Sequence, residues 1–563
     1  MHNVQNLITA TAAARRSLHL ATHPNNAGAP AYYRSLQEQV VQVLNTGTLG
    51  DTFYVSGKDL AVEALEVLVR AREEIPAFLA RALVWAREQG LMRLLPTLGL
   101  VVLSGGRGRT KSHFEAAFGR VIRTPDDLRA FVTLCKSGAV PGRNGLGGIA
   151  LKAVRAHLGG VSEYHAVKYG SAASREVTLR DILRMAHPRP ETAAVAERFG
   201  WLVKGASALG SDPTLNPQIR AFEALKLVPT TEEEQIALIR QGRLPFEVVV
   251  PTLKATTPAI WAELLRQAPY FNLLRNLVTF TRHGVFADEE NVRYAVRKLT
   301  DPRAVEHSRV LPFRFFDAWR RYTETEGNDS RIADALRSAL ELSFVTMPTF
   351  GDRTVAIGTD VSGSMSGPIS DKGSTRFIDI AGVFTGALLR RVEGRAIALP
   401  FDTVVHPDCG LSSRDEILTT AEKIARFGGG GTAIGSPVEH LLRRKTRVDV
   451  FIGITDNVDW AYGDGYSTSG SFLDLWSQYQ REVAPDARAY LVTIAPYRDA
   501  PAPMGTKGVR FIYGWSDDVI KFIAQDLAVA GASQVAEIEQ MTLGPTAEDP
   551  EEDPATTEGA AGL

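Results

Sequence analysis

The sequence predicts a multidomain protein in which a long all-α helical-repeat region is followed by an α/β domain with a doubly wound parallel sheet. The chain has 563 residues, which is too many for one hydrophobic core. From about residue 36 to 345, apolar residues recur at three- and four-residue spacing, as in amphipathic helices. After Pro348, short apolar runs of strand type alternate with helical runs.

The helical region consists of amphipathic segments joined by short breaks that contain proline or glycine. We expect helices over 58–74, 77–90, 125–138, 178–187, 258–269, 272–285 and 331–344. Their number and the absence of strand-like alternation favour stacked antiparallel helix pairs of solenoid type. Because no strict sequence period is present, a compact irregular helical domain remains the alternative.

The region after Pro348 has the pattern of a parallel sheet covered by helices on both faces. We expect strands over 353–360, 394–402, 448–456, 488–496 and 509–515, separated by helices over 377–392, 414–428, 433–445, 471–483 and 517–529. The predicted domains are therefore helical over 1–347 and α/β over 348–535. The last twenty residues, 544–563, are acidic and poor in apolar residues, which predicts a disordered tail.

Composition narrows the class of protein. Apolar residues make up 44% and charged residues 23%, as is usual for soluble globular proteins. The sequence contains no apolar run of the roughly 18 residues needed to cross a bilayer, and its first residues lack the order of a secretory signal, so we expect a cytoplasmic protein. The two cysteines, Cys135 and Cys409, support neither a disulfide framework nor a zinc site, so any metal should be bound through oxygen.

Positive charge is concentrated in one part of the helical region. Residues 101–190 contain fifteen Lys and Arg, six Asp and Glu, and four of the eleven histidines, although the formal net charge of the whole chain is -1. Such an excess is expected of a surface that binds a polyanion. The alternative is an ordinary solvated face whose charges have no ligand.

The string DVSGSMSG presents oxygen ligands directly after the first predicted strand. Asp360, Ser362 and Ser364 stand at alternate positions, and loops near two other strands present Thr432, after the glycines 428–431, and Asp456. Ligand sites of open α/β sheets lie at the carboxyl ends of the strands, and these hard oxygens suit an octahedral magnesium that keeps several waters. We expect the glycines to let the backbone approach the ion. A polar turn is the simpler alternative.

A hydrolytic interpretation of the same residues has little support. Ser362 or Ser364 could be a nucleophile near Asp456, but the only histidines of the domain, His406 and His440, are not in a setting that suggests a base. The GxSxG elbow is absent, and no lysine follows the glycine run as a phosphate-binding loop would require.

This pattern resembles the von Willebrand factor A domain and its metal-ion-dependent adhesion site, over roughly 350–530. The resemblance implies that Mg²⁺ or another divalent cation, held by these five residues, leaves one coordination position for an acidic group of a partner. On that basis the domain is a binding device, and the partner's identity is open.

The helical half resembles the TROVE domain of the Ro autoantigen family. The strings that carry this resemblance include GLGGIALKAV, VKYGSAASREVTLRDILRMAHPRP and SRVLPFRFFDAWRRY. In the first of them, Gly147 and Ile149 stand where the family commonly shows tryptophan and arginine. The order of TROVE and von Willebrand A domains is itself characteristic, and the chain most resembles the bacterial Ro proteins.

The resemblance implies a ring of HEAT-like helical repeats closed by the von Willebrand A domain, which needs no second subunit, so we expect a monomer. It implies a non-catalytic protein that binds Y RNA on its basic outer surface and single-stranded 3′ ends of misfolded RNA in its central hole. It further implies a role in RNA quality control or processing, with the exoribonuclease polynucleotide phosphorylase as a partner.

The basic excess at 101–190 coincides with the segment that matches the family's RNA-binding helices. Its members would contact phosphates, with Tyr169 available for stacking on a base and the glycine-containing basic loop at 107–113 lining the path of a single strand. His187 could instead end a helix. The candidate RNA-contact residues are Arg107, Arg109, Lys111, His113, Arg143, Lys152, Arg155, Lys168, Tyr169, Arg180, Arg184 and His187.

Overall fold

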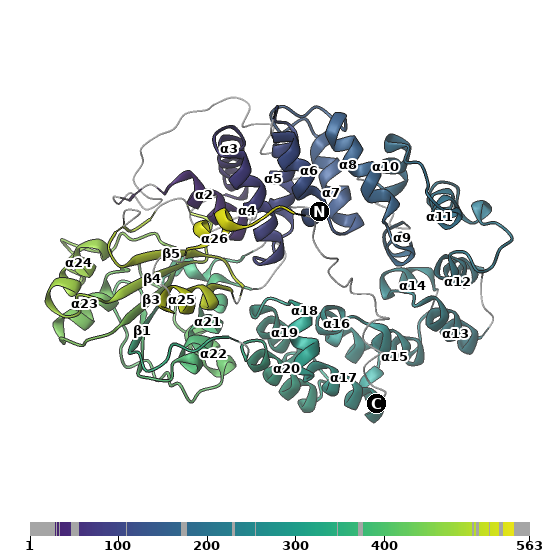
Figure 1. Ribbon diagram of the computed structural model, residues 1–563. Helices are drawn as coiled ribbons and strands as arrows, with labels where there is room; N and C mark the ends of the chain where they lie inside the picture. Colours follow the sequence, from purple (N-terminus) through teal and green to yellow (C-terminus); the bar gives the residue numbers. More distant parts are fainter. Residues whose placement is uncertain are drawn as a thin grey trace. The chain divides into compact units, whose positions relative to one another are not determined.

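The computed structural model (Figure 1) contains two compact units. The sheet unit gathers Met1–Gly106, Leu311–Asp317 and Leu340–Thr542, and the helical unit gathers Arg107–Val310, Ala318–Ala339 and Leu543–Leu563. Within these bounds the structure describes residues 29, 31–32, 34–46, 56–108, 110–170, 177–227, 231–253, 255–345, 347–369, 375–497, 500–502, 506–516, 518–528 and 533–544. The predicted acidic tail therefore lies outside the described residues, except for Gly544.

The helical unit is built from short amphipathic helices that follow one another closely. They are α6 (Thr110–Val121), α7 (Pro125–Lys136), α8 (Gly148–Gly159), α9 (Glu163–Gly170), α10 (Leu179–Ala186), α11 (Ala193–Lys204), α12 (Pro217–Lys226), α13 (Glu232–Gly242), α14 (Phe246–Thr252), α15 (Pro258–Gln267), α16 (Tyr270–Arg282), α17 (Glu289–Leu299) and α18 (Pro302–Ser308). α19 (Phe313–Thr323) and α20 (Ser330–Leu342) continue the series. All seven helices predicted as examples from apolar spacing are confirmed, with ends that differ by a few residues.

Local capping explains where several of these helices begin. At α7 the Thr124 side chain accepts a hydrogen bond from the Asp127 amide, and Asp127 accepts one from the Thr124 amide in return. Thr178 and Asp181 do the same for α10. These reciprocal bonds satisfy amides that the helix itself cannot, which is worth about 1 kcal/mol for each cap.

Among the described residues, five parallel strands form the sheet in the order β2-β1-β3-β4-β5. The strands are β1 (Val355–Asp360), β2 (Ala396–Phe401), β3 (Val450–Thr455), β4 (Arg488–Thr493) and β5 (Val509–Tyr513). The helices between them are α21 (Phe377–Arg391), α22 (Ile417–Ala425), α23 (Ser436–Arg443), α24 (Phe472–Glu482) and α25 (Asp518–Ala528). Each predicted strand and helix of the α/β region is thus confirmed.

Burial along the strands explains why their sequences do not alternate. Every residue of β1 and of β3 is buried, because both strands lie inside the sheet with helices on its faces. Gly358 pairs with Gly453 in the β1–β3 register. A Cβ on Gly358 would come 3.0 Å from the Phe451 ring, so a larger residue there would require the aromatic side chain to shift.

The sheet unit also contains helices from both ends of the described chain. Figure 1 shows α26 (Gln534–Gln540) beside α2 (Leu36–Thr46) and α4 (Pro76–Glu88); α3 (Gly57–Glu74) and α5 (Leu94–Ser104) complete the N-terminal group. The Trp85 indole donates a hydrogen bond of 3.1 Å to Glu537 Oε1. The sheet unit therefore does not begin at the change of secondary structure near residue 348, because N-terminal helices pack with the sheet. No helix among the described ranges is long and apolar enough to cross a membrane.

Candidate functional site

Three of the five predicted metal ligands lie close together at the end of the first strand. Asp360 is the last residue of β1, and its Oδ1 accepts a hydrogen bond of 2.9 Å from the Ser362 amide. This bond closes a tight turn, so that the hydroxyl oxygens of Ser362 and Ser364 lie 3.1 Å apart. All three side chains are buried, with exposed fractions of 3% or less.

Two further loops are hydrogen-bonded to this turn. This agrees with the prediction that loops near the ends of neighbouring strands lie close together. Thr455, at the end of β3, donates a hydrogen bond of 2.7 Å to Asp360 Oδ2, and Asp456 follows directly. The glycine run carries Thr432, and its Gly430 carbonyl accepts a hydrogen bond of 3.2 Å from the Gly363 amide. The five predicted ligands therefore come from three loops that are bonded to one another at the carboxyl edge of the sheet.

Two buried oxygen atoms of this group have no hydrogen-bond partner among the described residues: Thr432 Oγ1 and Asp456 Oδ2. Buried polar atoms of native proteins are nearly always paired, so each such atom requires an explanation. Burial and the neighbouring Asp456 carboxylate raise the pKa of Asp360, and burial raises the pKa of Asp456. A divalent cation would pair both atoms and offset the repulsion between the carboxylates, so the residues fit an oxygen-bound metal.

The glycine run has a role that the sequence interpretation missed. A Cβ on Gly431 would overlap the ring of Trp460, and a Cβ on Gly430 would come 3.2 Å from Asp402 Cγ. Gly430 also has a φ of 68°, a left-handed conformation that disfavours other residues. The glycines thus make room for Trp460 and Asp402 beside the site, in addition to any approach of backbone to an ion.

Among the described residues, the geometry does not provide the pairing of a serine with a histidine base that the hydrolytic interpretation requires. His406 Nε2 lies 3.3 Å from Asp402 Oδ1, and His440 lies on α23. Within the described part of the chain, no hydrogen bond joins a histidine to Ser362 or Ser364. Instead, the two serine hydroxyls lie 3.1 Å apart, and the Ser362 amide donates to Asp360.

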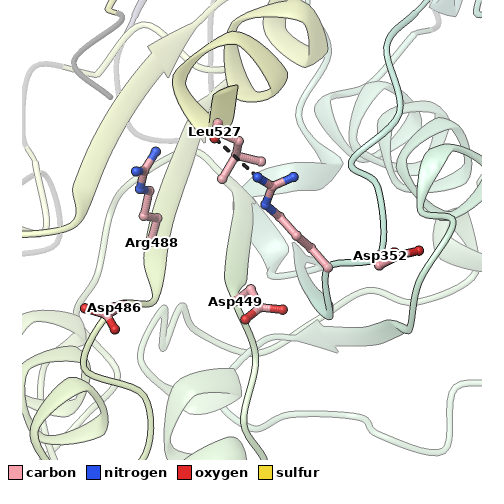
Figure 2. A pocket seen from close by; sticks show the side chains of 6 residues that line it. Asp352, Asp449, Asp486, Arg488 and Leu527 are labelled. Atoms are coloured by element: carbon pink, nitrogen blue, oxygen red, sulfur yellow. Dashed lines mark hydrogen bonds between the residues drawn. The ribbon is translucent and has the colours of Figure 1, made fainter. Parts of the chain in front are cut away.

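A pocket of about 500 Å³ lies at the opposite edge of the sheet, where β1, β3 and β4 begin. Figure 2 shows the side chains of Asp449, Asp486 and Arg488 around it, and its dashed line marks the hydrogen bond of 3.3 Å from Arg353 to the Leu527 carbonyl. Arg488 likewise donates to the Asp526 carbonyl. Because both guanidinium groups cap the end of α25, we assign them to stability.

Several predicted RNA-contact residues are exposed on α6, α8 and α10, and α8 packs against both of the other helices. Lys152 of α8 is paired with Glu115 of α6 at 3.0 Å, yet its side chain is 80% exposed. Lys111 is one helical turn before Glu115 and is exposed. Arg155 donates to the Ala186 carbonyl at the end of α10, next to His187. We call these residues the basic strip: Lys111, Lys152, Arg155, Arg184 and His187.

The other candidates lie outside the basic strip, and Arg143 and Lys168 are less exposed than Arg107 and Arg180. Arg143 is only 9% exposed and donates to the Gly147 carbonyl at 3.2 Å, which stabilises a turn. The Lys168 side chain is 17% exposed and pairs with Glu247 at 3.1 Å, while its ammonium lies 5.7 Å from the centre of the Tyr169 ring. Arg180 is exposed and donates to the Leu202 carbonyl, Arg107 is exposed, and His113 is partly exposed. Arg109 lies outside the described residues.

His187 ends α10 through its backbone. Its φ of 48° and ψ of 54° are left-handed, and its amide donates a hydrogen bond of 2.9 Å to the Leu183 carbonyl. The imidazole is not needed for this cap, and the residue is exposed. The helix-ending role and the RNA-contact role therefore belong to different atoms of His187.

Comparison with known proteins agrees with this architecture. A model of the TROVE domain matches residues 248–339, and a model of the Ro60 vWA domain matches residues 354–500. RNA-binding protein RO60 of Deinococcus radiodurans is 28% identical over 460 residues, which are 78% of this chain and 83% of that protein. The chain is similar to Ro proteins over most of its length.

A further protein and a solved structure are similar to this chain. RNA-binding protein RO60 of Caenorhabditis elegans is 27% identical over 240 residues, which are 41% of this chain and 36% of that protein. The crystal structure of the Deinococcus radiodurans RO (RSR) protein has the same fold, with a TM-score of 0.65 and 20% identity, over 88% of this chain and 100% of that one. The matched TROVE segment does not include the basic strip.

Proposed function

We propose that this chain is a non-catalytic, cytoplasmic RNA-binding protein that acts in RNA quality control or processing. Its ligands would be small noncoding Y RNA and the single-stranded 3′ ends of structured or misfolded RNA, and an exoribonuclease such as polynucleotide phosphorylase would be its partner. The observation that carries the proposal is the exposed basic strip across α6, α8 and α10. Relatives that bear the name RNA-binding protein RO60 support it.

The geometry of the strip suits a phosphate backbone better than it suits an isolated anion. Its cations lie on three separate helices, α6, α8 and α10, rather than converging on one point, so they can follow a chain of phosphates. Glu115 pairs with Lys152, but this surface ion pair is exposed and therefore weak, so a phosphate can replace the carboxylate. Arg155 and Arg184 add charge at the far end of the strip.

The test is binding of a stem-loop RNA with a single-stranded 3′ tail at several salt concentrations. We expect affinity to fall steeply with salt, because each neutralised phosphate releases counterions. Reversing the charges of Lys111 and Lys152 to glutamate should lower the slope of log K against log salt by roughly 0.7 to 1 for each phosphate that the protein no longer neutralises.

Lys445→Glu is the matched control, because Lys445 is 64% exposed and pairs with an exposed glutamate, Glu482, in the sheet unit. It should leave RNA affinity nearly unchanged. Salt-independent binding, or equal affinity of the Lys111/Lys152 variant and the wild type, would show that the strip is not the RNA surface.

A second function is favoured by the unpartnered Thr432 Oγ1 and Asp456 Oδ2. We propose that the site holds Mg²⁺ or a similar cation through Asp360, Ser362, Ser364, Thr432 and Asp456. When bound, the cation would supply an open position for an acidic group of a protein partner. Thr455 would keep Asp360 oriented through its hydrogen bond.

Thr432→Val tests the metal site. Valine removes only the unpartnered hydroxyl, so the Tm without metal should stay the same or rise slightly. Mg²⁺ at about 100 times its Kd should stabilise the wild type by about 2.7 kcal/mol, and this gain should be largely lost in the variant. Thr420→Val, which removes another buried, unpartnered hydroxyl on α22, should keep the Mg²⁺ effect. An equal Mg²⁺ effect in all three proteins would contradict the assignment.

The two proposals are separable. Asp360→Ala should abolish a metal-dependent protein contact and leave RNA affinity intact, because the metal residues and the basic strip belong to different units. Loss of both activities together would mean that the variant is misfolded or that the units do not act independently.

A further inference from the structure

Trp460 is tied to the candidate metal site by its backbone. Its amide donates a hydrogen bond of 3.0 Å to the Thr432 carbonyl, and the Ala461 amide donates one of 2.9 Å to the same oxygen. The segment after β3 therefore stays against the loop that carries Thr432. Any ligand that reaches a metal at Thr432 and Asp456 meets Trp460 as a neighbour.

The indole ring lies against this loop through its six-membered ring. Its Cζ2 atom is nearest to the position of a Cβ on Gly431, the residue before Thr432, followed by Cη2 at 2.7 Å and by Cε2, to which Nε1 is bonded, at 3.0 Å. Trp460 Nε1 is buried and has no hydrogen-bond partner in the described part of the chain. Because buried N–H groups are nearly always paired, this N–H is available to donate to an oxygen of a bound molecule.

Tyr466 extends this aromatic surface to the outside. Its ring lies 5.8 Å from the Trp460 ring at an angle of 89°, an edge-to-face arrangement. Tyr466 is 43% exposed, although large aromatic side chains are usually more buried. Its position is fixed by a turn in which the Tyr466 amide donates to the Gly463 carbonyl and the Gly463 amide to the Thr468 carbonyl.

We propose that Trp460 and Tyr466 determine which acidic partner binds the metal site. The Trp460 N–H donates to the carboxylate oxygen that the metal does not bind, and Tyr466 packs against the residue next to the acid. The partner is a peptide segment with a glutamate or aspartate beside an aromatic or apolar residue. This inference depends on the metal site proposed above and explains how that site would select its acidic partner.

The test uses the full-length chain loaded with Mn²⁺, whose affinity is measured by electron paramagnetic resonance. Two capped dipeptides, N-acetyl-Phe-Glu-amide and N-acetyl-Gly-Glu-amide, are the probes, and calorimetry gives their Kd. The variants are Trp460→Phe and Tyr466→Ala, with Ser467→Ala as an exposed control in the same loop.

We expect the wild type to prefer the Phe-Glu probe about fivefold, as one aromatic contact allows. Trp460→Phe should keep its Mn²⁺ Kd within about twofold and bind both probes roughly tenfold more weakly, the loss of one hydrogen bond to a charged group. Tyr466→Ala should abolish only the preference, and Ser467→Ala should change neither property.

Each contrary result has a distinct meaning. Unchanged probe binding by Trp460→Phe overturns the role of the indole, and equal affinity of the wild type for both probes overturns the role of Tyr466. If Asp360→Ala binds Mn²⁺ as the wild type does, the metal site itself is wrong and this inference is overturned with it.

A measurement on the wild type covers the case in which Trp460→Phe does not fold. With ¹⁵N-labelled indoles and Mg²⁺, one of the seven tryptophan side-chain signals should shift on addition of N-acetyl-Phe-Glu-amide, and EDTA should reverse the shift. If all seven signals stay in place while calorimetry shows that the probe binds, the indole does not contact the carboxylate and the proposal is wrong.

Discussion

Asp459 shows at the level of one residue how the loops around the candidate metal site are held together. Its carboxylate is buried and accepts hydrogen bonds from the Ile434 amide at 2.9 Å and the Phe472 amide at 3.1 Å. These bonds join the Thr432 loop to the start of α24. Burial nevertheless raises the pKa of Asp459 to about 7, because desolvation outweighs the two hydrogen bonds.

This pKa predicts a pH-dependent stability. Between about pH 4 and pH 7 the folded protein keeps a proton on Asp459 that the unfolded chain has lost, so the free energy of unfolding should fall as pH rises and level off above pH 7. Asp459→Asn has no such proton. Urea unfolding of both proteins at pH 5, 6, 7 and 8 should show the wild type losing a few kcal/mol relative to the variant as pH rises. A constant difference would mean that Asp459 titrates normally in the folded protein.

At the level of a single element, α10 has a stabilising cap at its first turn and a strained residue after its last turn. Thr178 and Asp181 cap its first turn reciprocally. Its last turn ends in His187, whose left-handed backbone is disfavoured for any residue with a Cβ. A left-handed residue at this position is usually glycine, so the histidine is retained at a cost in stability.

His187→Gly should therefore separate stability from function. Glycine adopts the left-handed conformation without strain, so the free energy of unfolding should rise by up to about 1 kcal/mol. RNA affinity should fall, because the exposed imidazole of the basic strip is lost. Lys445→Gly, at another left-handed position with a φ of 48°, should give a similar gain in stability without loss of RNA binding. A variant that is more stable and binds RNA as the wild type does would remove His187 from the RNA surface.

At the scale of the whole molecule, the sheet unit depends on segments far from the α/β sequence. Arg34 is 3% exposed; its guanidinium donates to the Tyr497 carbonyl at 3.0 Å and lies 5.0 Å from the centre of the Tyr513 ring. Tyr513 donates to Glu38 of α2, and burial raises the pKa of that carboxyl group. Trp85 of α4 packs 5.9 Å from the Phe522 ring of α25.

A fragment of residues 348–544 should therefore not fold as a stable monomer. Without α2 to α5 it would expose Tyr513 and Phe522, which are buried in the full chain, and large exposed apolar patches promote aggregation. Gel filtration and dye binding should show aggregation or a loosely packed state, whereas a chain ending at residue 544 should unfold at nearly the Tm of the full-length protein. A well-folded monomeric fragment would show that the N-terminal helices are dispensable for this fold.

The sequence predicts the elements and the candidate metal ligands, because both depend on local pattern. Apolar spacing distinguishes helices from buried strands, and the polar residues Asp360 and Asp456 follow buried strands whose parallel ends must lie at one edge of the sheet. The sequence also located the basic segment, since charge is a matter of composition. It could not rank the candidates within that segment, because exposure of Lys152 and burial of Arg143 depend on neighbouring helices.

Which distant residues meet depends on the packing of the elements. The pairing of Trp85 with Glu537, the place of Trp460 against Gly431 and the addition of α2 to the sheet unit join segments with no shared local signal. The physical reason is that burial is a property of packed elements: an indole or a carboxylate has the same local sequence whether its polar atoms reach water or a partner. The unpartnered atoms of Thr432, Asp456 and Trp460, on which the binding proposals rest, appear only after packing has excluded water from them.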